Sequence, residues 1–385
     1  MNHNIPYGKQ DITQDDIDAI ASVLRSDFIT QGPVTKAFEE DFAAYIGSKY
    51  AIAVANGTAA LHLSALALDV KEGQTIITSP LTFAASANCI RFCGGSVQFV
   101  DIDPATLCID LNQVEDQLKK DRKSKYKGVI PVDLAGYPVD TEALRSLTDQ
   151  YGLWILEDSC HAPGACFTDS KGVNQNCGNG IYSDLSIFSF HPVKHITTGE
   201  GGMITTNDSD KAKRIKRLRI HGVTKDPDLL IENHGGWYYE MQELGYNYRI
   251  TDFQCALGIS QLKRAGKSLN RRKEIAKKYT EVFQEYDFIK IPETRPGMSH
   301  AWHLYIIQVP DRKNLYDYLQ LNHINTQVHY IPVHLQPYYK KLGWKKGDFP
   351  YVEKYYEHCL SIPMYSSLSE EQQSYTIRKI LEFYK

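Results

Sequence analysis

Short apolar runs alternate with longer segments of helical periodicity between residues 50 and 206. The apolar runs are rich in β-branched and aromatic residues, as is typical of buried strands. We expect seven strands, at Tyr50–Val54, Thr75–Ser79, Val97–Asp101, Tyr126–Val132, Leu153–Glu157, Leu185–Phe190 and Met203–Thr206. Helical segments lie between several of them, at Ala59–Leu68, Leu111–Lys119 and Thr141–Tyr151. Because strands that alternate with helices usually pair in parallel, this pattern predicts an α/β fold around a mostly parallel seven-stranded sheet.

The pattern changes at about residue 255, where a long helical pattern extends from Phe253 to Phe283. Strand-like runs and further helical patterns follow, at Trp302–Val309, Asn325–Ile331, Lys313–Leu321 and Glu370–Phe383. We therefore expect a large domain over residues 1–255 and a smaller α/β domain over residues 256–385. The long helix carries a basic run that we expect to form a solvated face. This run comprises Arg271, Arg272, Lys273, Lys277 and Lys278.

Composition excludes several classes of protein. With 42% hydrophobic residues, 23% charged residues and a net charge of −3, the chain lacks the basic balance of a nucleic-acid or anionic-membrane binder. The N-terminus has no apolar core of a secretory signal, and no apolar run approaches the ~20 residues of a membrane span. The eight cysteines include no C-x-x-C pair, so we expect reduced, buried thiols in a cytoplasmic protein. No metal site is expected, because the spacing of Cys160, His161, Cys166 and Cys177 fits no structural zinc pattern.

Residues that follow each predicted strand are candidates for a site, because ligands of such sheets bind at the carboxyl ends of the strands. After the first strand, Gly57 allows a tight turn, and Thr58 and Ala59 open the next helix. Free amides at a helix start favour a phosphate, with the Thr58 hydroxyl as a further donor. For this motif alone, a helix N-cap at Thr58 is the commoner explanation.

Two further strands end in residues with candidate chemistry. Phe83 follows the second strand and can stack on a planar ligand, although a core position is commoner for one aromatic residue. Asp158 follows the fifth strand, where a buried carboxylate needs a cation, hydrogen-bond donors or a helix to cap. His161 is near enough to serve the same ligand, or it is a structural histidine.

The sixth strand leads into a loop that contains Lys194 and ends in glycines at positions 199, 201 and 202. A lysine between two buried strands is partly desolvated, which lowers its pKa and makes its amine a nucleophile toward carbonyls. For a single lysine, a solvated loop position is the commoner alternative. Ser189 is placed to donate to a phosphate. A phosphate cradle, an aromatic face, a carboxylate and a lysine are together the set that pyridoxal phosphate (PLP) needs.

Five motifs follow one another along the chain. They are Asn56–Leu61 (NGTAAL), Glu157-Asp158, Ser189–Gly202 with Lys194, Gly245–Arg249 (GYNYR) and Val328–Tyr330 (VHY). In this order they resemble the DegT/StrS group of sugar-nucleotide aminotransferases, which are PLP-dependent enzymes of fold type I. The resemblance covers nearly the whole chain and implies a large domain with a smaller C-terminal one.

The resemblance implies a role for each matching residue. Lys194 resembles the Schiff-base lysine, and Asp158 resembles the partner of the pyridinium nitrogen. Residues expected to hold the phosphate or the ring are Gly57, Thr58, Ala59, Ser189 and Phe83. Asn247 matches a residue that reaches the phosphate of a neighbouring subunit, which implies a homodimer with shared sites. His161 stands where the family commonly has Gln and can still donate to the cofactor's phenolic oxygen, whereas Asp133 is assigned no role.

The resemblance also indicates a reaction. Lys194 is present where a dehydratase branch has His, which favours transamination. The stretch Phe190–Gly202 is similar to that of members acting in pseudaminic acid biosynthesis. It implies amino transfer from L-glutamate to C4 of a UDP-linked 4-keto-6-deoxy-N-acetylhexose. Alternatives are another nucleotide-linked keto sugar, aminated at C4 or C3, and a PLP-binding regulatory protein without turnover. Candidates for contacts with the nucleotide sugar are Tyr7, His191, Arg249 and His329.

Overall fold

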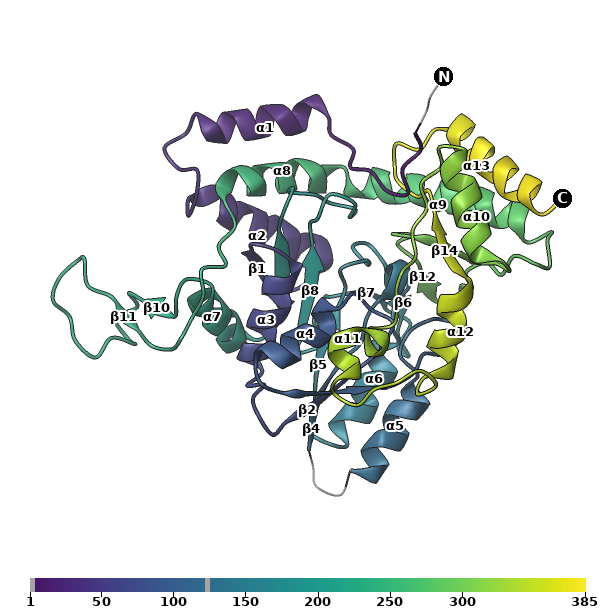
Figure 1. The fold of residues 1–385 in the computed structure, drawn as a ribbon. Coiled ribbons are helices and arrows are strands. Elements are labelled where there is room, and N and C mark those ends of the chain that lie inside the picture. The colour runs from purple at the N-terminus through teal and green to yellow at the C-terminus, as the bar shows by residue number, and fades with distance from the viewer. Residues whose placement is uncertain (1–3, 122–124) are drawn as a thin grey trace.

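The computed structural model describes residues 4–121 and 125–385. Its centre is a seven-stranded sheet with the strand order β1–β9–β8–β5–β4–β2–β3 (Figure 1). The strands are β1 (Tyr50–Val54), β2 (Thr75–Thr78), β3 (Ser96–Phe99), β4 (Tyr126–Ile130), β5 (Trp154–Asp158), β8 (Leu185–Ser189) and β9 (Gly202–Thr206). β9 is antiparallel to both neighbours, and the other pairings in the sheet are parallel. The prediction of a mostly parallel seven-stranded sheet is therefore confirmed.

Helices cover both faces of the sheet, which explains why its strands are apolar on both faces. Ile76 of β2 packs with the cluster of α3, α4 and α7, whereas the next residue, Ile77, packs with α5 and α6. Ala51 and Ala53 of β1 face the aromatic side chains of α2. The helices of these layers are α2 (Pro33–Ile46), α3 (Gly57–Ala67), α4 (Ala85–Phe92), α5 (Leu111–Lys120), α6 (Thr141–Asp149) and α7 (Ser209–Leu218).

Short polar side chains fix where most of these helices begin. Asn56, Asp110, Asp140 and Asp208 are the N-caps of α3, α5, α6 and α7, and each accepts hydrogen bonds from first-turn amides. Helix α4 begins after Ala84 without a side-chain cap. α4 was not among the predicted helices, because no capping residue marks its start in the sequence.

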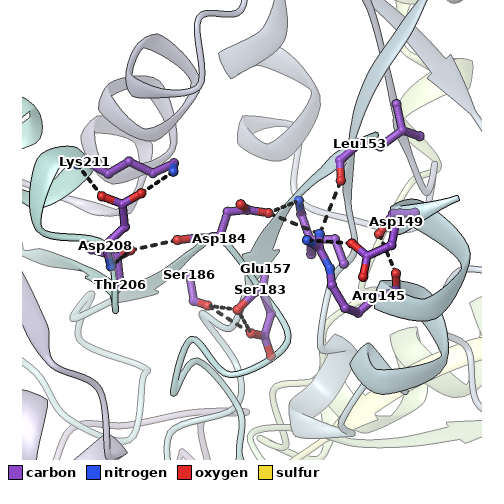
Figure 2. A network of polar contacts seen from close by, with 12 residues as sticks. Arg145, Asp149, Leu153, Glu157, Ser183, Asp184, Ser186, Thr206, Asp208 and Lys211 are labelled. Carbon is purple, nitrogen blue, oxygen red and sulfur yellow. Dashed lines mark hydrogen bonds and ion pairs between the residues drawn. The ribbon is translucent and has the colours of Figure 1, made fainter. Parts of the chain in front are cut away.

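Polar contacts hold β5, β8 and β9 in register at the amino ends of β5 and β8 (Figure 2). Asp184, directly before β8, accepts from the Ile155 amide at 2.9 Å and from Arg145 Nη2 at 3.1 Å. Thr206 Oγ1 donates to the Asp184 carbonyl at 2.8 Å. The carboxyl ends of β5 and β8 therefore lie side by side, at the edge of the sheet opposite to these contacts.

A second layer of structure is built on the antiparallel pair β13 (Tyr305–Gln308) and β14 (Cys359–Ile362). Its core joins aromatic and aliphatic side chains of the two strands and of three helices, and Ile5 near the N-terminus belongs to the same cluster. The surrounding helices are α9 (Ala265–Phe283), α10 (Arg312–Leu321), α12 (Pro350–His358) and α13 (Glu370–Phe383). The strand predicted at Asn325–Ile331 is wrong: this segment makes only an isolated bridge between Gln327 and Ser361, and then turns toward the large sheet.

The remaining elements are short or peripheral. A small sheet joins β12, β6 and β7, and β10 pairs with β11 in an arm that projects beside α7 (Figure 1). These elements are α1 (Gln14–Leu24), β6 (Cys166–Thr168), β7 (Asn174–Asn176), β10 (Val223–Thr224), β11 (Glu240–Met241), α8 (Asp252–Lys263), β12 (Met298–Ser299) and α11 (Pro337–Lys340).

The predicted domain boundary after residue 255 lies inside α8. Cys255 of this helix packs with Phe38 and Phe42 of the large domain. The long predicted helix is in fact two, because the backbone at Arg264 (φ −114°, ψ 10°) separates α8 from α9. We therefore propose the junction at Arg264 as the boundary between the two domains.

Arg272 corrects the prediction that the basic run is a solvated face. Its side chain is only 2% exposed, and Nη1 donates to the carbonyls of Trp302, His303 and Met364 at 3.0–3.2 Å. Burial lowers its pKa to about 10. This buried cation ties α9 to two loops of the smaller domain.

All eight cysteines are free thiols, and five of them are buried, as expected. Among the described residues, no helix combines the length and the apolar character that crossing a membrane requires.

We predict that Arg272→Ala lowers the free energy of unfolding by about 3 kcal/mol or more, because it leaves three carbonyls without a donor. Urea denaturation checks this value. Lys277→Ala on the same helix, where the Lys277 side chain is 77% exposed, is the control and should change stability by less than about 0.5 kcal/mol. Equal effects of the two substitutions would contradict the role given to Arg272.

Candidate active site

A cavity of about 490 Å³ lies at the carboxyl ends of the parallel strands. It brings together ten residues that the sequence analysis selected from distant segments. They are Tyr7, Gly57, Thr58, Phe83, Asp158, His161, Ser189, His191, Lys194 and His329. Residues that the sequence analysis did not select also line it, among them Ser86, Cys160, His303 and Tyr330.

The start of α3 forms one wall of the cavity. Asn56 is the N-cap of this helix, and its Oδ1 accepts from the Ala59 amide at 2.8 Å. The N-cap is therefore Asn56 and not Thr58. The Gly57 and Thr58 amides have no acceptor among the described residues, so they remain free for an anion.

Ser189, at the end of β8, faces this helix start. A Cβ placed on Gly57 would lie 3.1 Å from the Ser189 Cβ and 3.4 Å from its hydroxyl oxygen. Only a glycine allows the two segments to approach so closely without displacement. Two free amides and the hydroxyls of Thr58 and Ser189 thus surround one small anion site.

Asp158 ends β5 and is 6% exposed. Ser86 Oγ donates to its Oδ2 at 2.6 Å, and the Cys160 amide donates to its Oδ1 at 3.2 Å. Ser86 also shares a hydrogen bond of 2.7 Å with Thr82 Oγ1. These hydrogen bonds hold the carboxylate in one orientation and leave lone pairs free to accept a further hydrogen bond. A protonated ring nitrogen needs an acceptor of this kind.

Lys194 lies in the loop between β8 and β9 and is half-buried. Its amide donates to the His191 carbonyl at 2.9 Å, and Gly199 (φ 79°) lets the loop return toward the sheet. Burial lowers the pKa of its amine, and the neighbouring Cys160 and Asp158 only partly oppose that shift. A lowered pKa leaves more of the amine neutral and nucleophilic.

His161 is buried and has a defined partner on each ring nitrogen. Its Nδ1 lies 3.2 Å from the Ala135 amide, and its Nε2 lies 3.2 Å from Tyr330 Oη. The His303 ring lies 4.4 Å from it, centroid to centroid. Burial and the charge of Lys194 hold the pKa values of both histidines well below the ordinary range.

Further histidines of this region are also neutral. His329 Nδ1 shares a hydrogen bond of 2.8 Å with Ser361 Oγ, and burial lowers the pKa of His329 to about 3. His195 Nε2 donates to the Ala301 carbonyl at 2.8 Å, and its pKa is held well below the ordinary range. His300, outside the cavity lining, has a pKa of about 3 because of burial.

A buried carboxyl pair lies behind Asp158. Asp133, Glu157 and Cys177 place their polar atoms within 4.8 Å of one another. Both carboxyls already accept hydrogen bonds from the protein. Asp133 accepts from Ser159 Oγ and from the Val139 amide. Glu157 accepts from the Gly178 amide and from the hydroxyls of Ser183 and Ser186 (Figure 2). Burial and mutual repulsion raise the pKa of Asp133 well above its usual range. The pair therefore retains a proton and is satisfied without a metal.

Asn247 and Arg249 lie outside the lining of this cavity. Asn247 is exposed and bridges to Ile220, and the neighbouring Tyr248 carbonyl accepts from the Ala55 amide at 2.9 Å. The segment thus runs beside the anion site on the surface. Its predicted role requires a second subunit and stays a prediction.

The family model for DegT/DnrJ/EryC1/StrS aminotransferases matches residues 10–381. The chain belongs to this family. It is 40% identical, over 95% of this chain and 94% of the relative, to an uncharacterized protein of Methanocaldococcus jannaschii. It is 35% identical to the UDP-4-amino-4,6-dideoxy-N-acetyl-beta-L-altrosamine transaminase of Campylobacter jejuni, over 98% of each chain.

A solved structure extends the comparison to the fold and the cofactor. Spr1654 of Streptococcus pneumoniae, in its pyridoxamine phosphate (PMP) form, matches with a TM-score of 0.90 at 30% identity, over 98% of each chain. The same protein is also known in a PLP form. The fold type I architecture is confirmed, and the chain is a PLP-dependent aminotransferase.

The residues of the cavity fit PLP. Two free amides and two hydroxyls suit its phosphate, and the oriented Asp158 carboxylate suits its ring nitrogen. Lys194 supplies an amine of lowered pKa in the same cavity.

We predict that these five neutral histidines, four of them buried and His195 half-buried, destabilise the fold in acid. The unfolded chain binds protons below pH ~6.5, while the folded chain does not until far lower pH, so stability is lost as pH falls through this window. Each such histidine costs about 1.4 kcal/mol at pH 5.5 relative to neutral pH. His300→Asn keeps an acceptor for the Trp302 amide and should reduce the loss between pH 7.5 and 5.5 by that amount.

Urea denaturation at the two pH values measures this difference. His234→Asn is the control, because His234 is exposed and paired with Glu232. If His300→Asn left the pH dependence of wild type unchanged, the buried neutral histidine would not contribute as stated.

Proposed function

We propose that this aminotransferase moves the amino group of L-glutamate to C4 of a UDP-linked 4-keto-6-deoxy-N-acetylhexose, as in pseudaminic acid biosynthesis. The observation that carries transamination is the gathering of Lys194, Asp158 and the anion site in one cavity. The choice of sugar is supported by the transaminase of Campylobacter jejuni, which matches along 98% of both chains. It is also supported by the stretch Phe190–Gly202.

The roles of the residues follow from their surroundings. PLP, when bound, supplies an aldehyde for a lysine amine and a ring that withdraws electrons from the reacting carbon. Lys194 would hold the aldehyde carbon through Nζ, and the amine of the donor would take its place there. The Nζ amine would then accept the proton of the donor's α-carbon. Asp158 keeps the ring nitrogen protonated, and Ser86 holds Asp158 in place.

The phosphate is held at the start of α3. The Gly57 and Thr58 amides and the hydroxyls of Thr58 and Ser189 orient it there. Ala59 closes the first turn, because its amide is bonded to Asn56. Phe83, which is 63% exposed at the cavity, is free to cover the ring face.

The nucleotide sugar enters over residues at the open side of the same cavity. Tyr7 and His329 lie together, with ring centroids 5.5 Å apart, and His191 is exposed nearby. Arg249 would join them from the surface beside the anion site. A sugar aminated at C3 is the second candidate, and NMR of the product amine position distinguishes the two.

A homodimer with shared sites is part of the proposal. The arm around β10 and β11 projects from the body (Figure 1). It exposes several large apolar side chains. Ile231 is 88% exposed, Leu244 77% and Trp237 74%. Apolar groups on a projecting arm are typical of a subunit interface. Such an interface would place the exposed Asn247 at the phosphate of the second subunit.

Lys194→Ala should reduce turnover at least roughly 100-fold, because it removes both the nucleophile and the proton carrier. The variant should still bind PLP, since the anion site and Asp158 are intact. Turnover is followed as 2-oxoglutarate release, and bound cofactor is counted after release from the protein. Lys36→Ala, at an exposed position paired with Glu40, is the control. Near-normal turnover of Lys194→Ala would refute the assignment.

The double substitution Ile231→Glu/Trp237→Glu should convert the dimer to monomers, because it places two charges in the proposed interface. Light scattering during size-exclusion chromatography measures the mass. Leu321→Glu, at an 81% exposed position at the end of α10, is the matched control and should remain dimeric. A dimer that survives the arm substitutions, or a monomeric wild type, would contradict this part of the proposal.

A further inference from the structure

The turn over residues 133–136 has an unusual backbone next to the cavity. Ala135 has a φ of 58° and Gly136 a φ of 97°, a region that is unfavourable for alanine. A Cβ on Gly136 would lie 2.7 Å from the His161 carbonyl oxygen. Backbone strain of this kind is found where the surrounding structure enforces it, commonly at functional sites.

This turn aims the Ala135 amide at His161 Nδ1, 3.2 Å away. A backbone amide only donates, so Nδ1 carries no proton, and the neutral ring carries its proton on Nε2. Nε2 lies 3.2 Å from Tyr330 Oη. The direction of the second hydrogen bond follows: His161 donates and the Tyr330 oxygen accepts.

The Tyr330 proton is therefore left without an acceptor. Within the described part of the chain, His161 Nε2 is the one polar atom bonded to Tyr330 Oη. The tyrosine lines the cavity with Lys194, and its ring centroid lies 6.2 Å from that of Phe83. Burial raises its pKa, so the hydroxyl keeps its proton at physiological pH.

We propose that Tyr330 donates a hydrogen bond to an oxygen that carries or develops negative charge beside Lys194, and that His161 is the positioning residue that fixes this donor. The inference rests on the proposed use of this cavity for transamination. Two oxygens have the required chemistry, the phenolic oxygen of the cofactor and the carbonyl oxygen of the keto substrate. The direct contact that the sequence suggested for His161 would thus be made through Tyr330.

The test uses Tyr330→Phe, which removes one oxygen atom and keeps the ring. Stopped-flow absorbance follows one half-reaction in both directions: the PLP form with L-glutamate, and the PMP form with 2-oxoglutarate. Neither direction depends on the identity of the sugar. The removal of a hydrogen bond to an oxygen with negative charge should slow the reaction by roughly 10- to 100-fold. Tyr339→Phe is the matched control. The Tyr339 hydroxyl donates to Asn88 Oδ1 at 2.8 Å, and Tyr339 does not line the cavity.

The two sources of the oxygen predict different results. If the phenolic oxygen is the acceptor, Tyr330→Phe shifts the absorption maximum of the PLP form and slows the reaction in both directions. If the carbonyl oxygen is the acceptor, the absorption maximum stays unchanged, and the reaction is slowed by the same factor in both directions, because they share their transition states. Rates and spectrum that match those of Tyr339→Phe would overturn the inference while leaving transamination intact. A wild-type protein that reacts in neither direction would overturn both.

The positioning role has its own readout. His161→Gln keeps an acceptor for Ala135 and a donor for Tyr330, whereas His161→Leu keeps neither. We expect His161→Gln to retain most of the rate and His161→Leu to slow it. The effect of His161→Leu should be smaller in the Tyr330→Phe background than in wild type, because the two residues act as one unit. If His161→Leu slowed the reaction by the same factor in both backgrounds, the positioning role of His161 would be overturned.

Discussion

The antiparallel pairing of β9 with β8 is the constraint on which the site depends. Because β9 returns directly beside β8, the connecting loop over residues 190–201 stays at the carboxyl end of β8 and cannot leave the sheet. This holds Lys194 next to Ser189. β5 is parallel to β8, so Asp158 reaches the same edge, and β1 brings the start of α3 there from the other side of β9.

The part of the chain after Arg264 covers this edge. Its segments at residues 301–304 and 328–330 bring His303, His329 and Tyr330 onto the cavity, and the buried Arg272 holds the first of them through the Trp302 and His303 carbonyls. Burial keeps the histidines neutral and lowers the pKa of Lys194. One desolvated region therefore both prepares the amine and sets the directions of the hydrogen bonds around it.

Much of this architecture was predictable, because strand and helix periods are local properties of the sequence. The seven strands and the residues at their ends, including Lys194 and Asp158, follow from such patterns. Tyr330 and His303 were missed because their positions depend on how the smaller domain packs on the larger. Arg272 carried a usable signal: it lies on the apolar stripe of α9 with Ile275, Ala276 and Tyr279, at spacings of three, four and seven residues. That position indicates burial even though its neighbours in sequence are basic.

The visible absorbance spectrum of the purified protein, loaded with PLP and then mixed with L-glutamate, tests the central claim most directly. The account predicts a yellow band from PLP joined to Lys194, which glutamate replaces with the shorter-wavelength band of PMP. A band that glutamate leaves unchanged would contradict L-glutamate as the amino donor. No band at all after incubation with PLP would contradict the assignment of Lys194 and of the cavity around it.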